Sequence, residues 1–176
     1  MTMSMNYAQM VEGCRHRNAN AQRALYEELA PMAMGVCYRY TADRDEAQDL
    51  LQDGFIKIFE RIGTLHDPQK LRSWTYSIMV NTCIQHYRRS RHTILQPMDD
   101  IVDDDGSEMP YTMDDIVKAM STISPAQRMA FNLCCIEELP MDEVANRMNC
   151  NELAVRVALC KARKRMRQYL ENKKEE

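Results

Sequence analysis

The sequence predicts an all-α protein made of two small helical domains joined by a flexible acidic linker, with a helix-turn-helix in the second domain. The chain has 176 residues, only five glycines and 45% hydrophobic residues, a composition that favours helices. Apolar residues recur at spacings of three and four through several long segments, which is the period of an amphipathic helix. Acidic side chains gather in residues 99–115, which carry eight acidic and no basic groups. We therefore expect domains at residues 1–95 and 112–176, with a linker at 96–111.

The first helices are predicted at residues 6–12 and 21–41. Residues 18–20 can cap the second of these helices, since asparagine side chains accept hydrogen bonds from free amide groups. Pro31 lies inside the second segment and has no N–H group, so we expect it to kink the helix or to start a new one.

Residues 43–63 predict a third helix with one buried and one charged side. Its apolar stripe consists of Ala47, Leu50, Leu51, Gly54, Phe55, Ile58 and Ile62. The outward row consists of Asp45, Asp49, Gln52, Asp53 and Lys57. Gly63 is expected to end the helix. A row of acidic groups suits a basic groove on a protein better than DNA, although a merely solvated helix side would look the same.

Residues 71–91 predict a long amphipathic helix that ends in a basic run. Its inward stripe is formed by Leu71, Trp74, Thr75, Ile78 and Thr82. Hydroxyl, amide and guanidinium groups line the other face, at Ser77, Asn81, Gln85 and Arg88. Such groups can bond to base edges, and Arg88, Arg89 and Arg91 can bind phosphates. The alternative is a solvated face whose basic end offsets the helix dipole.

The C-terminal half predicts a helix-turn-helix. Ser124 followed by Pro125 is a strong helix start, and Pro140 opens a further helix that ends near Met148. Asn149 tolerates the left-handed conformation of a turn, and Asn151 can cap the last helix. The run of residues 161–167 has five basic groups in seven, which is more than a helix dipole requires and indicates DNA contact.

Three segments resemble one known family. DEAQDLLQDGFIKIF, RSWTYSIMVNTCIQHYRR and SPAQRMAFNLCCIEELPMDEVANRMNCNELAVRVALCKARKRMRQYL resemble, in this order, segments of extracytoplasmic-function (ECF) sigma factors of the sigma-70 family. The resemblance implies binding of core RNA polymerase, through the clamp helices of its largest subunits, by Asp49, Gln52, Asp53 and Lys57. It implies contact with the −10 promoter element by Leu65, His66, Lys70, Ser77, Asn81, Gln85, Arg88, Arg89 and Arg91. It implies contact with the −35 element by Asn151, Glu152, Arg156, Lys161, Arg163, Lys164 and Arg165.

The sequence departs from the family pattern at a few positions. Gly54 stands where a larger apolar residue is usual. Ala154 replaces a usual threonine, and Val157 and Ala158 replace a Ser-Arg pair, so two common DNA contacts are missing. We expect the −35 contact to be weaker or differently specified.

The expected function is that of a sigma factor, which directs initiation by recognising and melting the −10 element and contacting the −35 element. The protein would have no cofactor and would not be an enzyme. We expect it in the cytoplasm without membrane insertion, and the family implies an anti-sigma factor as a further partner. Two alternatives stay open: a stand-alone dimeric helix-turn-helix regulator, and a metal-dependent enzyme that uses Asp103, Asp104 and Asp105.

The cysteines predict free thiols rather than disulfides or a metal site. Seven cysteines are an odd number, and no CxxC pair is present. Cys83 with His86, and Cys14 with His16, could each supply two ligands to zinc, but no third and fourth ligand follows at the usual spacing.

Overall fold

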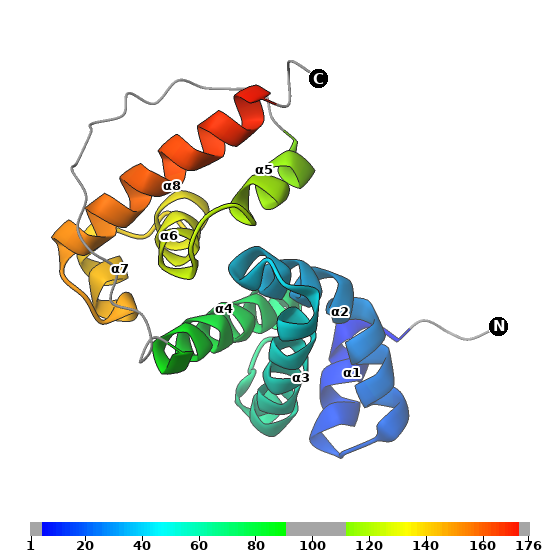
Figure 1. The fold of residues 1–176 in the computed structure, drawn as a ribbon. Helices are drawn as coiled ribbons and strands as arrows, with labels where there is room; N and C mark the ends of the chain where they lie inside the picture. Colours follow the sequence, from blue (N-terminus) through cyan, green and yellow to red (C-terminus); the bar gives the residue numbers. More distant parts are fainter. Residues whose placement is uncertain (1–4, 91–111, 173–176) are drawn as a thin grey trace. The chain divides into compact units, whose positions relative to one another are not determined.

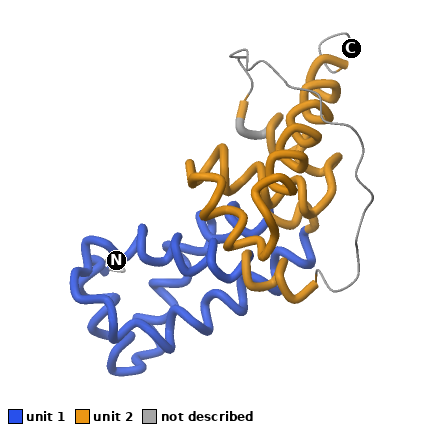
Figure 2. Tube along the Cα trace, turned by 90° about the vertical axis from the view of Figure 1, so that its left-hand side faces the viewer, with its two compact units in different colours: residues 1–38, 44–83 blue, residues 39–43, 84–176 orange. Residues whose placement is uncertain are grey.

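A computed structural model describes residues 5–90 and 112–172. Every element in these two ranges is a helix, which confirms the all-α prediction (Figure 1). The predicted linker, Arg91 and the aspartates at 103–105 lie outside the described residues. The chain forms two compact units, one of residues 1–38 and 44–83 and the other of residues 39–43 and 84–176 (Figure 2).

The first unit begins with α1 (Tyr7–Arg15) and with α2 (Ala19–Thr41), whose residues 39–41 belong to the second unit. Asn6 caps α1 in a reciprocal capping box with Gln9, and the Asn18 side chain accepts from the amides of Asn20 and Ala21. Both starts agree with the prediction. Pro31, however, starts no new helix: α2 runs through it as one element, with the proline ring exposed.

The helices α1 and α2 approach each other closely at Gly13. A methyl group built on Gly13 would overlap Cβ of Ala21, and a Cβ atom cannot rotate away. Gly35, inside α2, has nothing within 4 Å of the same position. The two glycines therefore provide a matched pair, since one is required by packing and the other is not.

We expect Gly13→Ala to destabilise the first unit by about 1–3 kcal/mol, the usual cost of overpacking. Gly35→Ala should instead stabilise it by about 0.5–1 kcal/mol, because alanine loses less conformational entropy than glycine inside a helix. Trp74 is the only tryptophan and lies in this unit, so its fluorescence during urea unfolding measures both changes. Equal effects of the two substitutions would contradict the close α1–α2 contact.

The unit continues with α3 (Arg44–Arg61), two 3₁₀ turns, η1 (Ile62–Thr64) and η2 (Pro68–Lys70), and α4 (Leu71–Ser90), of which residues 71–83 belong to this unit. The predicted apolar stripe of α3 is buried, including Gly54. Gly63 does not end α3 as predicted: the helix passes at Ile62 into a 3₁₀ turn, and no glycine of the described residues has a positive φ.

Gly54 is explained by the packing of α3 on α4. The Sδ and Cε atoms of Met79, which is fully buried, occupy the space that a side chain at Gly54 would fill. The space that a larger residue at this position would fill is thus filled by Met79 of the neighbouring helix.

The second unit contains α5 (Met113–Met120), α6 (Pro125–Phe131), the π-helical turn η4 (Asn132–Ile136), α7 (Met141–Met148) and α8 (Glu152–Asn172). Ser124 caps α6 in a capping box with Gln127, as the Ser-Pro start predicts. The predicted helix-turn-helix is formed by α7 and α8: Asn149 is left-handed (φ 54°, ψ 50°), and Asn151 Oδ1 accepts from the Ala154 amide at 2.8 Å. Val144, Ala145 and Val155 are buried in this unit, as the sequence predicts.

A buried arginine organises the start of this unit. Arg128 is 6% exposed, and backbone carbonyls accept hydrogen bonds from its guanidinium. Its Nε atom donates to the Met120 carbonyl and its Nη2 atom to the Ile123 carbonyl, both at 3.0 Å. Its Nη1 atom donates to the carbonyl of Thr41, which belongs to the same unit. The guanidinium thereby satisfies carbonyl groups where α5 ends.

Candidate functional site

The outward face of α3 carries unpaired negative charge. Asp49, Gln52 and Asp53 are all exposed, and none of the three has a partner within the described residues. The opposite side of the helix is buried, so this face is held rigidly towards solvent. It is therefore available to a partner with positive charge.

An exposed isoleucine lies in the middle of this face, and the sequence interpretation missed it. Ile56 is 57% exposed, the largest value among the exposed large hydrophobic residues. It follows Gln52 by four residues and Asp53 by three, so the three side chains are neighbours on the helix surface. This spacing from two residues of the outward row could have revealed the exposed isoleucine from the sequence alone. An apolar group ringed by polar groups is the usual layout of a binding hot spot.

Lys57 differs from the other residues predicted for this face. Its Nζ atom donates to Oγ1 of the buried Thr82 at 3.1 Å, and its side chain is half-buried. The ammonium group thus has a structural partner on α4. Its predicted contact with a partner protein stays a prediction.

The polar face of α4 is exposed as the spacing predicts. Ser77, Asn81, Gln85, Arg88 and Arg89 are all exposed, while Leu71, Thr75, Ile78 and Thr82 are buried on the other side. The Ser77 hydroxyl donates to the Ser73 carbonyl at 3.0 Å, which leaves its oxygen free to accept. The Asn81 amide has no partner in the described part of the chain, so it can both donate and accept. These groups match the donors and acceptors of base edges.

The loop before α4 presents two of its three predicted residues. His66 and Lys70 are exposed, but Leu65 is 4% exposed and packs in the core of the first unit. Arg15 Nη2 donates to the Leu65 carbonyl at 2.6 Å, which fixes the loop against α1. Any contact made by Leu65 would have to come from its backbone.

The basic residues of α8 do not share one side of the helix. Successive residues turn by about 100°, so Arg163 and Arg165 point in nearly opposite directions. Arg163 Nη2 donates to Sγ of Cys135 at 3.6 Å, beside η4. Glu152 and Arg156 are exposed near the start of α8, and Lys164 follows Arg156 by eight residues on a neighbouring part of the surface. The Asn151 side chain is engaged as the helix cap. One DNA groove could contact only part of this set.

The cysteines offer no metal centre in the described ranges. No group of three or more histidine, cysteine, aspartate or glutamate side chains could hold an ion there. Cys14 and Cys83 are buried, and His16 pairs with Glu12 at 3.0 Å. Burial raises the pKa of the Cys14 and Cys134 thiols, which makes them less nucleophilic. None of the described helices is long and apolar enough to cross a membrane.

Comparison with known families shows to which family the chain belongs. The Sigma-70 region 2 model matches residues 25–93, and the Sigma-70 region 4 model matches residues 113–166. The chain belongs to the sigma-70 family. The helices α3 and α4 with their exposed polar faces fall in region 2, and α5 to α7 with most of α8 fall in region 4.

Relatives place the sigma factor in the ECF group. It is 27% identical to RNA polymerase sigma factor SigV of Bacillus subtilis over 135 residues, which covers 75% of this chain and 80% of SigV. It is 24% identical to ECF RNA polymerase sigma factor SigE of Mycolicibacterium smegmatis, covering 83% of this chain and 60% of SigE. The ECF resemblance noted in the sequence is thereby confirmed.

Solved structures of similar proteins include the sigma factor RpoE of Bartonella quintana in complex with the anti-sigma factor NepR. It has 18% identity to this chain and a TM-score of 0.49, and the match covers 83% of this chain and 94% of that one. CnrH in complex with the cytosolic domain of CnrY has 17% identity and a TM-score of 0.47, covering 94% of this chain and 95% of that one. As a sigma factor, the chain has core RNA polymerase and promoter DNA as its partners.

Proposed function

We propose that this sigma factor binds core RNA polymerase through α3, recognises and melts the −10 element through α4, and contacts the −35 element through α8. One observation supports the proposal most. Region 2 and region 4 match in the family's order, and the residues that the family pattern assigns to α3 and α4, apart from the half-buried Lys57, lie on exposed, rigidly held faces within the described residues.

The contact with core polymerase is the best supported part of the proposal. Asp49, Gln52 and Asp53 present acceptors and negative charge, which would repel DNA and attract a basic protein surface such as the polymerase clamp helices. Ile56 supplies the apolar contact that an acidic row alone lacks. A stand-alone dimeric regulator would leave this face without a function.

Melting of the −10 element follows from differential binding. The hydroxyl and amide groups of Ser77 and Asn81 bond to base edges, while Arg88 and Arg89 bind phosphates. A base must leave the duplex before its edge and ring become fully accessible, at a cost of a few kcal/mol of stacking. Contacts that exist only with the unpaired strand therefore shift the promoter towards the melted state. The polymerase performs the chemistry, so the role proposed here is not enzymatic.

The contact with the −35 element is expected to be modest. Arg156 is exposed near the start of α8, but Ala154, Val157 and Ala158 offer no hydrogen-bond donors beyond the backbone. Binding at this element should depend mainly on phosphate contacts from residues such as Arg156 and Lys164.

Run-off transcription with bacterial core polymerase tests the proposal. The template is a set of genomic fragments that includes the DNA upstream of the gene for this protein. We expect discrete transcripts that appear only when the protein is added. An absence of core binding and of transcripts, with polymerase from the native host, would leave the dimeric regulator as the better account.

The free protein should bind promoter duplex poorly. Residues 116–176 carry 11 basic and 8 acidic side chains, so the region 4 half supplies little attraction for DNA by itself. We expect a dissociation constant no tighter than the nonspecific range, about 1–100 μM at physiological salt, in a fluorescence anisotropy titration. Tight binding that resists added salt would contradict the need for core polymerase.

The remaining expectations belong to the same proposal. The sigma factor would act in the cytoplasm, where the polymerase is, and it would use no cofactor. An anti-sigma factor stays a prediction from the family. Co-purification of the full chain from its native host, followed by identification of bound proteins, tests it.

A further inference from the structure

An apolar ridge lies on the first two turns of α8. It consists of Leu153, which is 47% exposed, and Val157, which follows four residues later and is partly exposed. Each of them is two residues from the fully buried Val155, so each lies about 160° around the helix from that valine. The ridge therefore faces away from the core of the second unit. None of the contacts proposed above involves either side chain.

Cationic side chains border this ridge on both sides. Successive residues turn by about 100°, which puts Arg156 on one edge of the ridge and Lys161 on the other. Lys164 continues the line of the ridge about two turns further along α8. Glu152, the acidic residue of the first turn, lies about 120° from the middle of the ridge and so outside this face. The surface thus has an apolar centre and positive edges.

This layout fits the major groove of DNA. Phosphates form both edges of the groove, and Arg156 and Lys161 can each contact one of the two edges. The apolar group that base edges present in the major groove is the C5 methyl of thymine, and aliphatic side chains pack on it. G·C pairs present hydrogen-bonding groups there, which Leu153 and Val157 would leave unpaired. The ridge therefore favours T·A pairs over G·C pairs.

The helix-turn-helix brings the ridge to the bases. In this motif the N-terminal residues of the second helix contact base edges, and Leu153 and Val157 occupy such positions because α8 starts at Glu152. We infer that the two side chains pack on thymine methyl groups, and that the −35 element of this sigma factor carries T·A pairs at neighbouring positions. Phosphate contacts would hold the helix in the groove, while the ridge selects the sequence. The inference rests on the proposed function, which brings α8 to the −35 element, and it adds the base that is read.

Replacement of thymine by deoxyuridine tests the inference directly. Deoxyuridine pairs with adenine as thymine does and lacks only the C5 methyl group. In a promoter identified by run-off transcription, each thymine of the −35 element is replaced singly, on either strand. Transcription by core polymerase with limiting full-length protein should fall about fourfold at one or more positions, the ratio that corresponds to the burial of one methyl group. The same replacement between the −35 and −10 elements is the control and should change transcription less than twofold.

Two variants assign the methyl contact to the ridge. Leu153→Ala and Val157→Ala each shorten an aliphatic side chain on the outward side of α8, and alanine favours the helix. Each variant should lose the sensitivity at the position that its side chain contacts, so that the ratio of thymine to deoxyuridine promoter activity falls from about four to about one. Val117→Ala is the matched control, because Val117 is a partly exposed valine on α5 of the same unit. It should keep the fourfold ratio.

The outcomes separate this inference from the proposed function. Transcripts that tolerate deoxyuridine at every −35 position would overturn the inference and leave the sigma role intact. A methyl effect that survives in both Leu153→Ala and Val157→Ala would assign the contact to other residues and overturn it as well. Weaker binding of the Leu153→Ala variant to core polymerase, with the methyl effect unchanged, would make the ridge a protein contact instead. An absence of all transcripts would reject the sigma role, and the assignment of the ridge to a −35 element would be rejected with it.

Discussion

Changing both Asp49 and Asp53 to lysine is expected to abolish the activity of this protein with core polymerase. Truncating one charge of a buried interfacial pair costs about 2–5 kcal/mol, and reversal adds repulsion. Two reversals on one helix face should therefore weaken core binding by about a thousandfold or more. Both side chains are exposed and unpaired, so the fold of α3 should not change. Affinity for core polymerase and run-off transcription measure the effect.

The matched control places the same charge change elsewhere. Asp142 and Glu171 are exposed on α7 and α8, and changing both to lysine alters the net charge by the same amount. This double variant should keep its affinity for core polymerase within a few-fold, because neither residue belongs to the α3 face and salt screens exposed charges outside a contact. Equal losses in both double variants would mean that overall charge, and not the α3 face, drives binding. An unchanged affinity in the Asp49→Lys/Asp53→Lys variant would remove α3 as the core-binding surface.

The helical faces could be predicted from the sequence because they depend on spacing within one element. Ser77 and Asn81 are four residues apart and share a side of α4 wherever the helix lies. Turn chemistry was equally local: Asn149 adopts the left-handed conformation and Asn151 caps α8 as their side chains favour.

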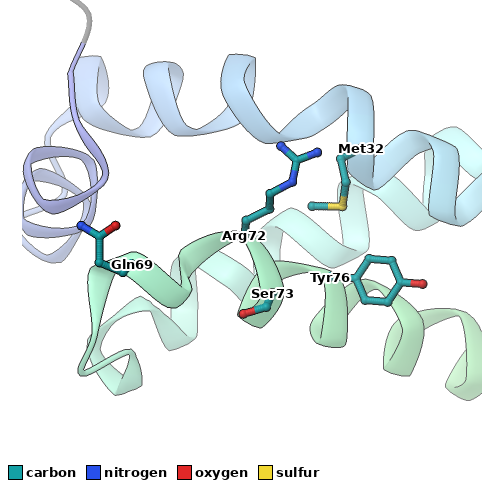
Figure 3. A pocket seen from close by; sticks show the side chains of 5 residues that line it. All are labelled: Met32, Gln69, Arg72, Ser73 and Tyr76. Atoms are coloured by element: carbon teal, nitrogen blue, oxygen red, sulfur yellow. The ribbon is translucent and has the colours of Figure 1, made fainter.

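Features that depend on packing between elements could not be predicted in this way. Lys57 lies in the outward row of α3, but Thr82 of α4 accepts its hydrogen bond. Leu65 is in a loop, yet it is buried. Met32 of α2 and Arg72, Ser73 and Tyr76 of α4 line one pocket although about forty positions separate Met32 from the others, so no local spacing indicates it (Figure 3). The need for glycine at position 54 likewise depends on another helix, because Met79 of α4 fills the space beside it.

The second large effect is expected from Arg128→Met. Methionine has a similar length and fits an apolar setting, but it cannot donate hydrogen bonds. The carbonyls of Met120, Ile123 and Thr41 would lose the guanidinium as a donor, two of them from bonds of 3.0 Å, although the Met120 carbonyl keeps the Ile123 amide at 3.4 Å. Bonds from a charged group contribute about 1.5–3 kcal/mol each, and a buried acceptor left unpaired carries a desolvation cost. We expect the second unit to lose roughly 3–5 kcal/mol of stability.

Amide hydrogen exchange on the full-length protein measures this loss in the second unit alone, which matters because a two-unit chain need not unfold in one step. Amides of α6 such as that of Ala130, which is buried, should lose about a hundredfold or more of their protection. Arg147→Met is the control: Arg147 Nε pairs with Glu143 at 3.0 Å on the same unit, but that pair is partly exposed and contributes under about 1 kcal/mol. Similar protection in the two variants would mean that Arg128 contributes no more to stability than a partly exposed arginine. Apolar packing around Met120 and Ile123 would then hold α5 against α6.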